Sequence, residues 1–547
     1  MDLYLDEYND LEKYSEILFD RDIKRLKTVK NKRKLEPLPN LENLPTIPQF
    51  FENLNVFITG GTGFMGKVLI EKILRSCPGV NKIYLLLRPK KGCNEQTRIN
   101  EMFKIPLYDC LRKENPDAIS KVQIISGNCE QPNLGLSEES MNLLIENIHV
   151  VYHVAASVRF DDPLKKAVLM NVRATRDVVE LCKKMRNLKV LVHVSTSYCN
   201  TDKQIIDEIV YPYQADWRKI IEMAETFDED KIRILQPKIL DHFPNTYTFT
   251  KSLAENLVND ECENIPTVIL RPSIVVGTMN DPFPGWIDNL NGPAGFFVGA
   301  GSGVLHNLYC DGNIVPDYVP VDKAISSIII ASWYQVHNTK AKKQQTLVIN
   351  ACTSNIIAVS NNTILDLLMA INKIYPFNRR IWYPFLFYTK NTITFHFCFI
   401  FFHLIPGIFL ELLLRLTGND LQLMKIYRKI YIANNALKFF MINQWAFKNG
   451  HFVSLNDIML DSDKKVFNVD IYNVHAIDTL KTGIFGFKTH LLKEPTNFHD
   501  TLPKARKLLS RFYIANCIVG FLYGLAFFFV LLYIIPSFST KSLNGFL

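Results

Sequence analysis

The sequence predicts an α/β fold, in which a doubly wound parallel sheet is followed by a mainly helical domain and a transmembrane helix. From residue 55 to about residue 335, short apolar runs alternate with stretches of helical length. This alternation is typical of parallel strands connected by helices. Residues 514–535 then carry no charge, and a helix of that length reaches about 33 Å, enough to cross the apolar core of a bilayer.

The composition excludes several classes of protein. The 547 residues are 48% hydrophobic and 21% charged, which rules out a wholly disordered chain. The net charge of +8 is too mild to indicate a nucleic-acid partner, and it suits anionic headgroups or phosphorylated small molecules. The 11 cysteines include no Cys-x-x-Cys pair, and the N-terminus has no apolar signal segment, so a cytosolic compartment is expected. No spacing of ligands predicts a metal site, and His153 and His193 are expected to be core residues.

The chain divides into four predicted segments. Residues 1–48 are an extension to which no chemistry is assigned. Its basic run from Arg21 to Lys34 is expected to be a solvated, partly helical surface, and contact with a membrane surface is the alternative. Residues 49–335 form the sheet domain, with strands expected at 55–59, 82–87, 122–126, 149–155, 190–196 and 267–273. The alternation then fades, and residues 360–512 are mainly helical, aromatic and basic. Residues 514–535 are the transmembrane helix.

A glycine-rich turn follows the first predicted strand and opens the first predicted helix. In such turns Gly60 permits the tight bend, Gly63 lets backbone approach a pyrophosphate, and Gly66 allows the helix to pack closely on the strand. The strand–turn–helix context predicts a Rossmann-type dinucleotide site. The residues expected to bind the cofactor here are Thr59, Gly60, Gly61, Thr62, Gly63, Phe64, Met65 and Gly66.

The end of the second predicted strand is basic. Sites that prefer NAD usually place a carboxylate there, to bind the 2′-hydroxyl of the ribose. Here Arg88 is followed by Lys90 and Lys91, and its guanidinium can pair with a 2′-phosphate. The sequence therefore favours NADPH as the cofactor; a merely solvated basic loop is the alternative.

Tyr247 and Lys251 are four residues apart, so a helix would place the phenol and the ammonium on one face. A nearby cation favours the phenolate, so Lys251 is expected to lower the pKa of Tyr247. Upstream, a predicted strand ends in the hydroxyls Ser195, Thr196 and Ser197, which can hold a substrate carbonyl beside Tyr247. An ordinary helix surface is the alternative for the Tyr/Lys pair alone.

Two apolar stretches bear on the membrane. Basic residues lie just before residues 514–535, and only Lys541 follows, so the positive-inside rule places the large N-terminal part in the cytosol. Residues 392–410 are also apolar but contain His396, His403 and Pro406. An interfacial helix or a lipid-facing wall of a substrate tunnel fits this stretch better than a span, and an ordinary core helix remains an alternative.

Several long motifs resemble the alcohol-forming fatty acyl-CoA reductases, a family of the extended short-chain dehydrogenase/reductase superfamily. The resemblance runs from near residue 47 to the C-terminal anchor. It is densest at ITGGTGFMGKVLIEKILR, VYHVAASVRFDDPLKKAVLMNVRATR, HVSTSYCN, YTFTKSLAE and RPSIVVGTMNDPFPGWIDNLNGPAGFFVGAGSG.

The resemblance implies roles for individual residues. Thr196, Tyr247 and Lys251 are the implied catalytic trio, with Ser197 as a second choice for the hydroxyl. Ala155 is implied to line the cofactor. Further implied positions are Ala156 and Val158 at the cofactor, Asn171 in support of the active site, Arg271, Pro272 and Ser273 beneath the nicotinamide, and Asn128 at the adenine. Asn128 stands where the family usually has Asp.

The resemblance also implies the activity: NADPH-dependent reduction of long-chain fatty acyl-CoA to a fatty alcohol, with release of CoA, through a bound aldehyde. Residues 360–512 then form the C-terminal fatty acyl-CoA reductase domain, and the membrane is that of the endoplasmic reticulum or the peroxisome. Three alternatives stay open: an aldehyde-forming reductase, another extended short-chain dehydrogenase or epimerase, and a cofactor-binding membrane scaffold. The oligomeric state is left open.

Overall fold

The computed structural model describes residues 18, 22, 34–39, 41–89, 92, 94–212, 215–338, 346–418, 422–472, 476–495 and 497–543. Its centre is a seven-stranded sheet in the order β11-β7-β5-β4-β1-β2-β3, in which every neighbouring pair is parallel. The strands are β1 (Asn55–Thr59), β2 (Lys82–Leu87), β3 (Val122–Ser126), β4 (Val150–His153), β5 (Val190–Val194), β7 (Thr267–Pro272) and β11 (Leu347–Ala351).

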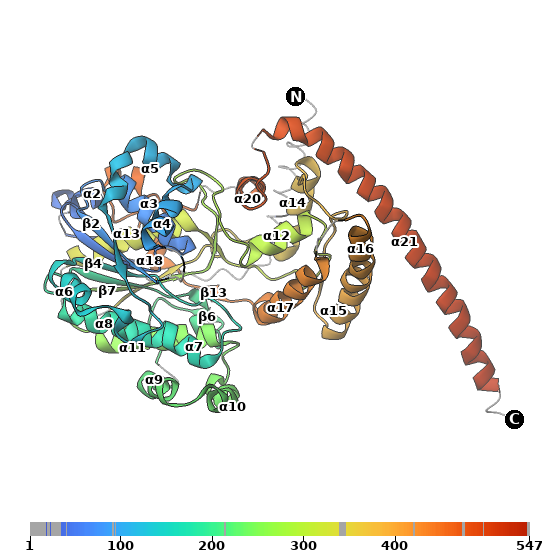
Figure 1. Ribbon diagram of the computed structural model, residues 1–547, viewed down its shortest axis with the longest axis horizontal. Coiled ribbons are helices and arrows are strands. Elements are labelled where there is room, and N and C mark those ends of the chain that lie inside the picture. Colours follow the sequence, from blue (N-terminus) through green and yellow to red (C-terminus); the bar gives the residue numbers. More distant parts are fainter. Residues whose placement is uncertain are drawn as a thin grey trace.

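Helices cover both faces of this sheet, which confirms the predicted doubly wound fold (Figure 1). One face packs against α3 (Phe64–Ser76) and α13 (Val321–His337). The other packs against α8 (Ala174–Lys184), α9 (Trp217–Thr226) and α11 (Thr246–Glu261). The residues of β1, β4 and β5 are all buried, as expected for strands covered on both sides.

All six predicted strands are present in the central sheet, and the seventh strand of this sheet was missed. β11 lies beyond residue 335, where the alternation was expected to end, and pairs with β7 at the edge of the sheet. The chain order reverses at β1, whose two neighbours are β2 and β4. Ligands of open α/β sheets bind at such a switch point, beyond the carboxyl ends of the strands.

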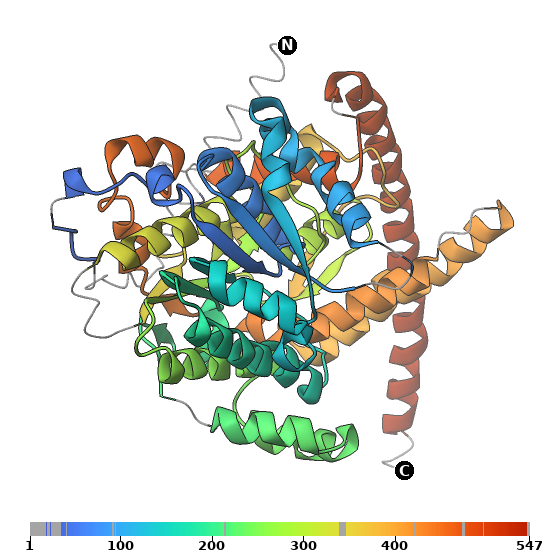
Figure 2. The ribbon, with the colours of Figure 1, turned by 60° about the vertical axis from the view of Figure 1, so that its left-hand side comes forward.

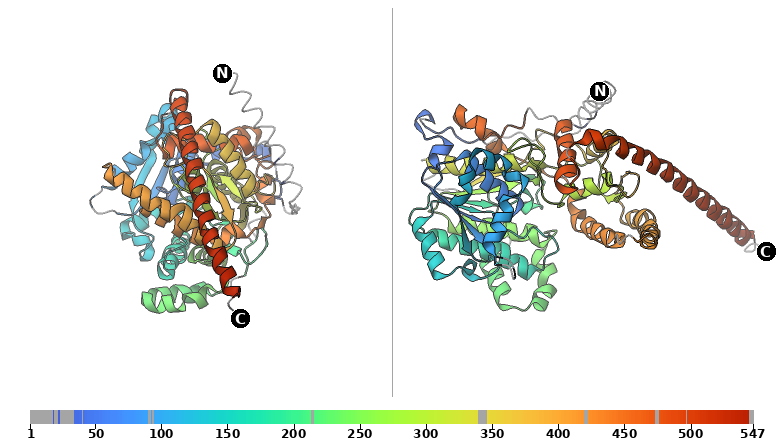
Figure 3. Two further views of the ribbon diagram at one scale, coloured as in Figure 1. Left: turned by 90° about the vertical axis from the view of Figure 1, so that its right-hand side faces the viewer. Right: turned by 45° about the horizontal axis from the view of Figure 1, so that its top comes forward.

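The C-terminal part is mainly helical, as predicted. It contains α14 (Asn361–Ile374), α15 (Thr392–Phe399), a π-helical segment (Ile400–Leu404), α16 (Ile405–Leu416), α17 (Leu423–Ile442), α18 (Gly450–Ser454), α19 (Asp461–Val466), α20 (Ala476–Gly486) and α21 (Phe498–Leu543). Most of these helices lie to one side of the sheet domain, and α21 extends away from the body as a single long helix (Figures 1 and 3). The predicted transmembrane residues lie within α21.

Short parallel pairs connect the two parts: β6 (Ile205–Ile206) pairs with β13 (Ala446–Phe447), and β9 (Asn307–Tyr309) pairs with β12 (Phe387–Thr389). A further short pair, β8 (Ile274–Val276) with β10 (Tyr318–Pro320), lies within the sheet domain. The remaining helices are α2 (Ile47–Phe50), α4 (Glu95–Phe103), α5 (Asp109–Glu114), α6 (Glu138–Asn147), α7 (Leu164–Val168), α10 (Glu229–Leu240) and α12 (Pro293–Gly301).

The N-terminal extension is not simply solvated. Most of its basic run lies outside the described residues, but Asp22 is buried and its carboxylate accepts hydrogen bonds from Ser360 N (2.8 Å) and Thr363 Oγ1 (2.7 Å) at the start of α14. Leu35 and Leu38 are buried in the core of the sheet domain. The expectation of a solvated surface for the basic run is wrong at Asp22, because a carboxylate is stabilised at a helix N-terminus. Leu35 and Leu38, which follow the run, are stabilised by burial.

Candidate active site

The turn between β1 and α3 has no room for a side chain at two of its glycines. Gly60 has a φ of +76°, and a Cβ there would lie 2.6 Å from the backbone nitrogen of Ala155. A Cβ at Gly66 would lie 2.3 Å from the carbonyl oxygen of Gly60. Thr62 and Gly63 are exposed, so the turn presents backbone to its outer side next to the N-terminus of α3. This cradle fits the pyrophosphate of a dinucleotide.

The other residues of the turn hold it in place. Thr59 is buried at the end of β1, where its Oγ1 lies 2.7 Å from His153 Nδ1 and accepts a hydrogen bond from Ala155 N (3.3 Å). Phe64 stacks on Trp286 with ring centroids 5.4 Å apart. Gly61 faces Leu85, and Met65 packs at the margin of the core. Thr59, Phe64 and Met65 thus support the turn from within the protein.

Two arginines lie at the end of β2. The side chain of Arg88 is 64% exposed, and its Nη1 lies 3.6 Å from Glu130 Oε1. Arg98, in α4, donates to the backbone carbonyl of Arg88 (2.5 Å). Sequence reasoning missed Arg98, because only the fold brings α4 back to the strand end. The Oδ1 of Asn128 accepts a hydrogen bond from Glu130 N (3.0 Å), so this side chain also shapes its own turn.

Tyr247 and Lys251 both lie in α11, as the spacing predicts. Thr196, which ends the segment after β5, is a side-chain hydrogen-bond partner of Tyr247. Ser197, the second choice for this hydroxyl, is fully buried at the start of the turn that follows Thr196. The structure therefore brings Thr196 and Tyr247 together at the carboxyl end of the sheet.

The expectation that the pKa of Tyr247 is lowered is wrong. Burial raises the pKa of Tyr247 to about 12, and the hydrogen bond with Thr196 lowers it only in part. Lys251 Nζ donates to the carbonyl of Val194 (2.6 Å) and lies 3.4 Å from His193 Nε2, so its charge is directed to the strand end. Tyr247 is thus a protonated phenol at neutral pH, which is the form that can give up a proton during a reduction.

The pKa of Lys251 is also shifted. Burial lowers its pKa to about 8, against the opposing effect of the Glu255 carboxylate one turn further along α11. Burial also lowers the pKa of His193, and the positive charge of Lys251 adds to that effect. The imidazole therefore lies beside Lys251 as a neutral group.

A buried polar network fixes α11 to the sheet. The Glu255 carboxylate accepts two hydrogen bonds from Arg271, at Nε (2.8 Å) and Nη2 (2.6 Å). Arg271 is fully buried and also donates to the carbonyls of Asp207 and Ile209. Asn171 donates to Thr250 Oγ1 (3.0 Å) and accepts from Ser157 N (2.8 Å), so it joins α11 to the loop after β4. These contacts position the helix that carries Tyr247 and Lys251.

An apolar cavity of about 390 Å³ begins beside Tyr247. Phe160, one of its lining residues, stacks on Tyr247 at 5.7 Å between ring centroids and contacts Phe440 of α17 at 5.2 Å. Further lining residues come from α12, which precedes the C-terminal part, and from two helices of that part: Phe296 and Ala300 of α12, Ile364 and Leu368 of α14, and Ala436 and Leu437 of α17. The apolar cavity therefore lies next to the candidate active site, with the Phe160 ring between it and Tyr247.

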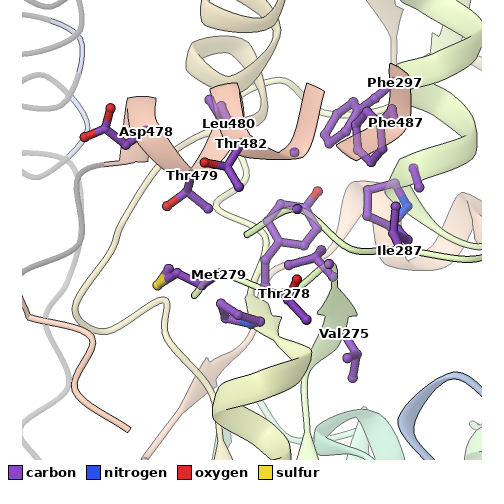
Figure 4. A pocket seen from close by; sticks show the side chains of 18 of the residues that line it. Val275, Thr278, Met279, Ile287, Phe297, Asp478, Thr479, Leu480, Thr482 and Phe487 are labelled. Carbon is purple, nitrogen blue, oxygen red and sulfur yellow. The ribbon is translucent and has the colours of Figure 1, made fainter. Parts of the chain in front are cut away.

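A second cavity of about 270 Å³ adjoins the first and shares Phe297 and Tyr318 with it. Figure 4 shows it between the strand residue Val275 and the side chains of α20, with Phe297 and Phe487 close together at one end. Thr479 and Thr482 of α20 add hydroxyls to its wall. Residues 275–280, which follow the sheet, thus contact the C-terminal part directly.

The family profile described as "Male sterility protein", of NAD-binding type, matches residues 58–328. The profile "Sterile", also described as "Male sterility protein", matches residues 402–494. Among solved structures, the chain resembles the reductase (R) domain of a nonribosomal peptide synthetase from Mycobacterium tuberculosis, with a TM-score of 0.55 at 17% identity over 83% of this chain and 95% of that one. A likeness at that identity supports the fold.

These matches and the fold define a nicotinamide-dependent oxidoreductase. Fatty acyl-CoA reductase 1 of Rattus norvegicus is 37% identical over 476 residues, 87% of this chain and 91% of that protein. Fatty acyl-CoA reductase 1 of Homo sapiens is 36% identical over the same shares. Fatty acyl-CoA reductase wat of Drosophila melanogaster is 34% identical over 84% of this chain and 88% of that protein. The chain belongs to the fatty acyl-CoA reductase family.

Proposed function

We propose that the protein reduces a long-chain fatty acyl-CoA to the fatty alcohol and releases CoA, using NADPH. The observation that carries this proposal is the position of Tyr247. Its phenol is paired with Thr196, stands on the same helix as Lys251, and stacks on Phe160 at the wall of an apolar cavity. A proton donor at the mouth of an apolar chamber suits a lipid whose reactive end is a carbonyl.

Bound NADPH supplies the hydride for each of two reductions. In the first, Thr196 and Tyr247 donate hydrogen bonds to the thioester oxygen as negative charge develops on it. Tyr247 gives its proton to this oxygen, and the hemithioacetal passes its hydroxyl proton to sulfur as the C–S bond breaks, so that CoA leaves as a thiol and an aldehyde remains. The Tyr247 phenolate regains a proton from solvent before the second reduction, in which a second NADPH supplies the hydride. In the second, Tyr247 gives its proton to the aldehyde oxygen, and the alcohol is formed. Lys251, with the Tyr247 hydroxyl, is proposed to hold the ribose next to the nicotinamide.

The apolar cavity is proposed to hold the acyl chain between the two steps. Its walls from α12, α14 and α17 are mainly aliphatic and aromatic. Each methylene removed from water contributes about 0.8 kcal/mol, so release of a long-chain aldehyde is unfavourable while the cavity holds it. This retention favours the alcohol over the aldehyde as the product that leaves.

Arg88 is proposed to select NADPH through the 2′-phosphate, with Arg98 beside it. Replacing Arg88 with Asp puts a carboxylate at this position, and we expect NADPH affinity to fall about tenfold or more, since hydrogen bonds to charged groups contribute about 1.5–3 kcal/mol. NADH affinity should change far less. Titration of both cofactors by fluorescence checks this.

The matched control for Arg88 is Arg186→Asp. Arg186 is also exposed and paired with a glutamate, Glu146, at 2.9 Å, but it lies outside the proposed site. The affinities for NADPH and for NADH should both be unchanged in Arg186→Asp. Equal losses of NADPH and NADH affinity in Arg88→Asp would show that Arg88 does not bind the 2′-phosphate.

The pKa of Lys251 predicts a pH dependence. A lysine whose pKa is lowered to about 8 is an ammonium below that pH and loses its charge above it. We therefore expect kcat/KM to fall as the pH rises through about 8. Lys251→Arg keeps its charge at all these pH values, so any activity it retains should not show the alkaline decline. If Lys251→Arg showed the same alkaline decline, the decline would be caused by the titration of another group.

The membrane part of the proposal rests on two helices. Within the residues that the structure describes, Thr392–Leu416 and Asp500–Ala526 are long and apolar enough to cross a bilayer, and the second has none of its apolar window buried. We propose that α21 anchors the protein through residues 514–535 as a single pass, with the catalytic part in the cytosol. The membrane is that of the endoplasmic reticulum or the peroxisome.

Expression of the full chain in a host cell, followed by lipid analysis, tests the proposed function. New fatty alcohols should appear, and their chain lengths would report the preferred substrate. Accumulation of fatty aldehydes instead would indicate an aldehyde-forming reductase. Unchanged lipids, with no NADPH oxidised when acyl-CoA is added to the purified protein, would favour a cofactor-binding scaffold.

A further inference from the structure

The segment formed by α15, the π-helical residues and α16 has two different faces. Its inner face consists of buried residues four positions apart: Phe395, Phe399, His403, Gly407 and Glu411. These pack against α17; Phe399 stacks on His403, and the Tyr427 ring lies against Gly407. The inner face is therefore an ordinary protein interface.

The outer face is apolar and exposed. Its residues are 36–80% exposed: Ile393, Phe397, Ile400, Phe401, Ile408, Phe409, Leu412, Leu413 and Leu416. The most apolar 18-residue window of Thr392–Leu416 has a mean hydropathy of 2.2, and only 22% of this window is buried. A contiguous apolar surface of this kind indicates a partner that is itself apolar.

Polar contacts on the inner face tie this segment to the protein. His403 Nε2 accepts a hydrogen bond from the backbone of His306 (3.0 Å), and Glu411 accepts one from the backbone of Met424 (2.8 Å). To cross a bilayer alone, the segment would have to break these bonds and expose His403 and Glu411 to lipid, which is costly. A helix with one apolar face free and the other fixed to protein suits the plane of a membrane interface.

The segment also lies close to the proposed anchor. Trp382, ahead of α15, donates from Nε1 to Asn516 of α21 (2.9 Å), and the rings of Tyr383 and Tyr513 are 5.3 Å apart. Tryptophan and tyrosine gather where a helix enters a bilayer. In Figures 2 and 3 the segment runs across the direction of α21, as expected if one helix spans and the other lies flat.

The charges around the segment fit an anionic lipid surface. Lys425, Arg428 and Lys429 at the start of α17 are exposed. They directly follow the apolar segment in the chain. Each such cation near an anionic leaflet contributes about 1 kcal/mol of attraction.

We propose that the outer face of α15 and α16 is embedded in the interface of an anionic bilayer, as a second membrane contact beside α21. This inference rests on the membrane association proposed above. Its consequence concerns the substrate route. The first part of α17 packs on the embedded segment through Leu423 and Tyr427, whereas its last part lines the apolar cavity through Leu437 and Phe440. One helix thus separates the lipid from the chamber, and the acyl chain enters from the membrane side.

Photo-crosslinking of the full chain tests this inference. The protein is reconstituted into vesicles of phosphatidylcholine and phosphatidylserine that contain a phosphatidylcholine with a diazirine in its acyl chain, and lipid adducts are mapped by mass spectrometry. We expect adducts on residues 392–416 as well as on 514–535. The double variant Phe409→Asp, Leu413→Asp should lose adducts on 392–416 by about tenfold or more, because carboxylates in the apolar layer are unfavourable.

The matched control is Ile234→Asp on α10, where an isoleucine is 77% exposed on a helix far from α16 (Figure 1); it should leave the adduct pattern unchanged. Retained NADPH oxidation by the double variant in detergent would show that it folds. Adducts on 514–535 alone would overturn the inference and leave the anchor intact. Adducts on neither segment would refute the membrane association itself. Protein–protein crosslinks through residues 392–416 in place of lipid adducts would overturn the inference in favour of a second copy of the chain.

Discussion

Replacing Tyr247 with Phe is expected to lower kcat for acyl-CoA reduction by about 10²–10⁴-fold, the usual contribution of a positioned general acid. The phenol is partly buried, its pKa is raised to about 12, and its hydroxyl pairs with Thr196. It is thus held as a proton donor at the carbonyl. Phenylalanine keeps the ring and its stacking on Phe160, so the loss should fall on chemistry alone.

Both reductions should fail in Tyr247→Phe, because one site performs both. Rates are measured separately with acyl-CoA and with the free aldehyde. Tyr152→Phe is the control: this tyrosine lies in β4, is buried, and its hydroxyl contacts Ser332 (3.0 Å), which also donates to the carbonyl of Ile328. The control should keep nearly full activity. If Tyr247→Phe reduced the aldehyde at the rate of the unchanged protein, Tyr247 could not be the proton donor for the second step.

Replacing Arg271 with Met is expected to lower the free energy of unfolding by about 3–5 kcal/mol, since it leaves a buried carboxylate without its partner. Glu255 and Arg271 are both fully buried and make two hydrogen bonds to each other. Loss of these hydrogen bonds would also weaken the attachment of α11, the helix that carries Tyr247 and Lys251, to the sheet. Denaturant unfolding of the purified protein, followed by tryptophan fluorescence, measures the change.

Two further variants separate the buried pair from a general effect of losing an arginine. Arg186→Met breaks the exposed pair with Glu146 and should cost about 0–1 kcal/mol. The double variant Glu255→Gln, Arg271→Met removes both buried charges and should recover much of the lost stability. Equal losses in Arg271→Met and Arg186→Met would contradict the importance of the buried pair.

The parts of the fold that sequence reasoning predicted are those encoded locally. The six strands are runs of apolar residues next to one another, and the glycine turn, Tyr247 and Lys251 each lie within a few consecutive residues. β11 was missed because its only partner in the sheet, β7, lies far away in the chain. A single run of five residues also carries little signal of its own.

The candidate site, too, could be predicted from the sequence only where it depends on neighbouring residues in the chain. The strand end predicted a hydroxyl of Ser195, Thr196 or Ser197 beside Tyr247, and the family resemblance indicated Thr196, but the raised pKa of Tyr247 depends on burial by distant segments. His153 was correctly expected in the core, yet its contacts with Thr59 and Thr175 come from strand register and helix packing. The Glu255–Arg271 pair and Arg98 could not be predicted, because charged residues give no local sign of the partner they meet.

The ratio of NADPH oxidised to CoA released tests the central claim most directly. Purified full-length protein in vesicles is given a long-chain acyl-CoA, NADPH oxidation is followed by absorbance, and free CoA is followed by its thiol. Two hydride transfers at one site predict a ratio of two, with fatty alcohol as the product and no free aldehyde. A ratio of one, with aldehyde accumulating, would contradict the account and leave an aldehyde-forming reductase.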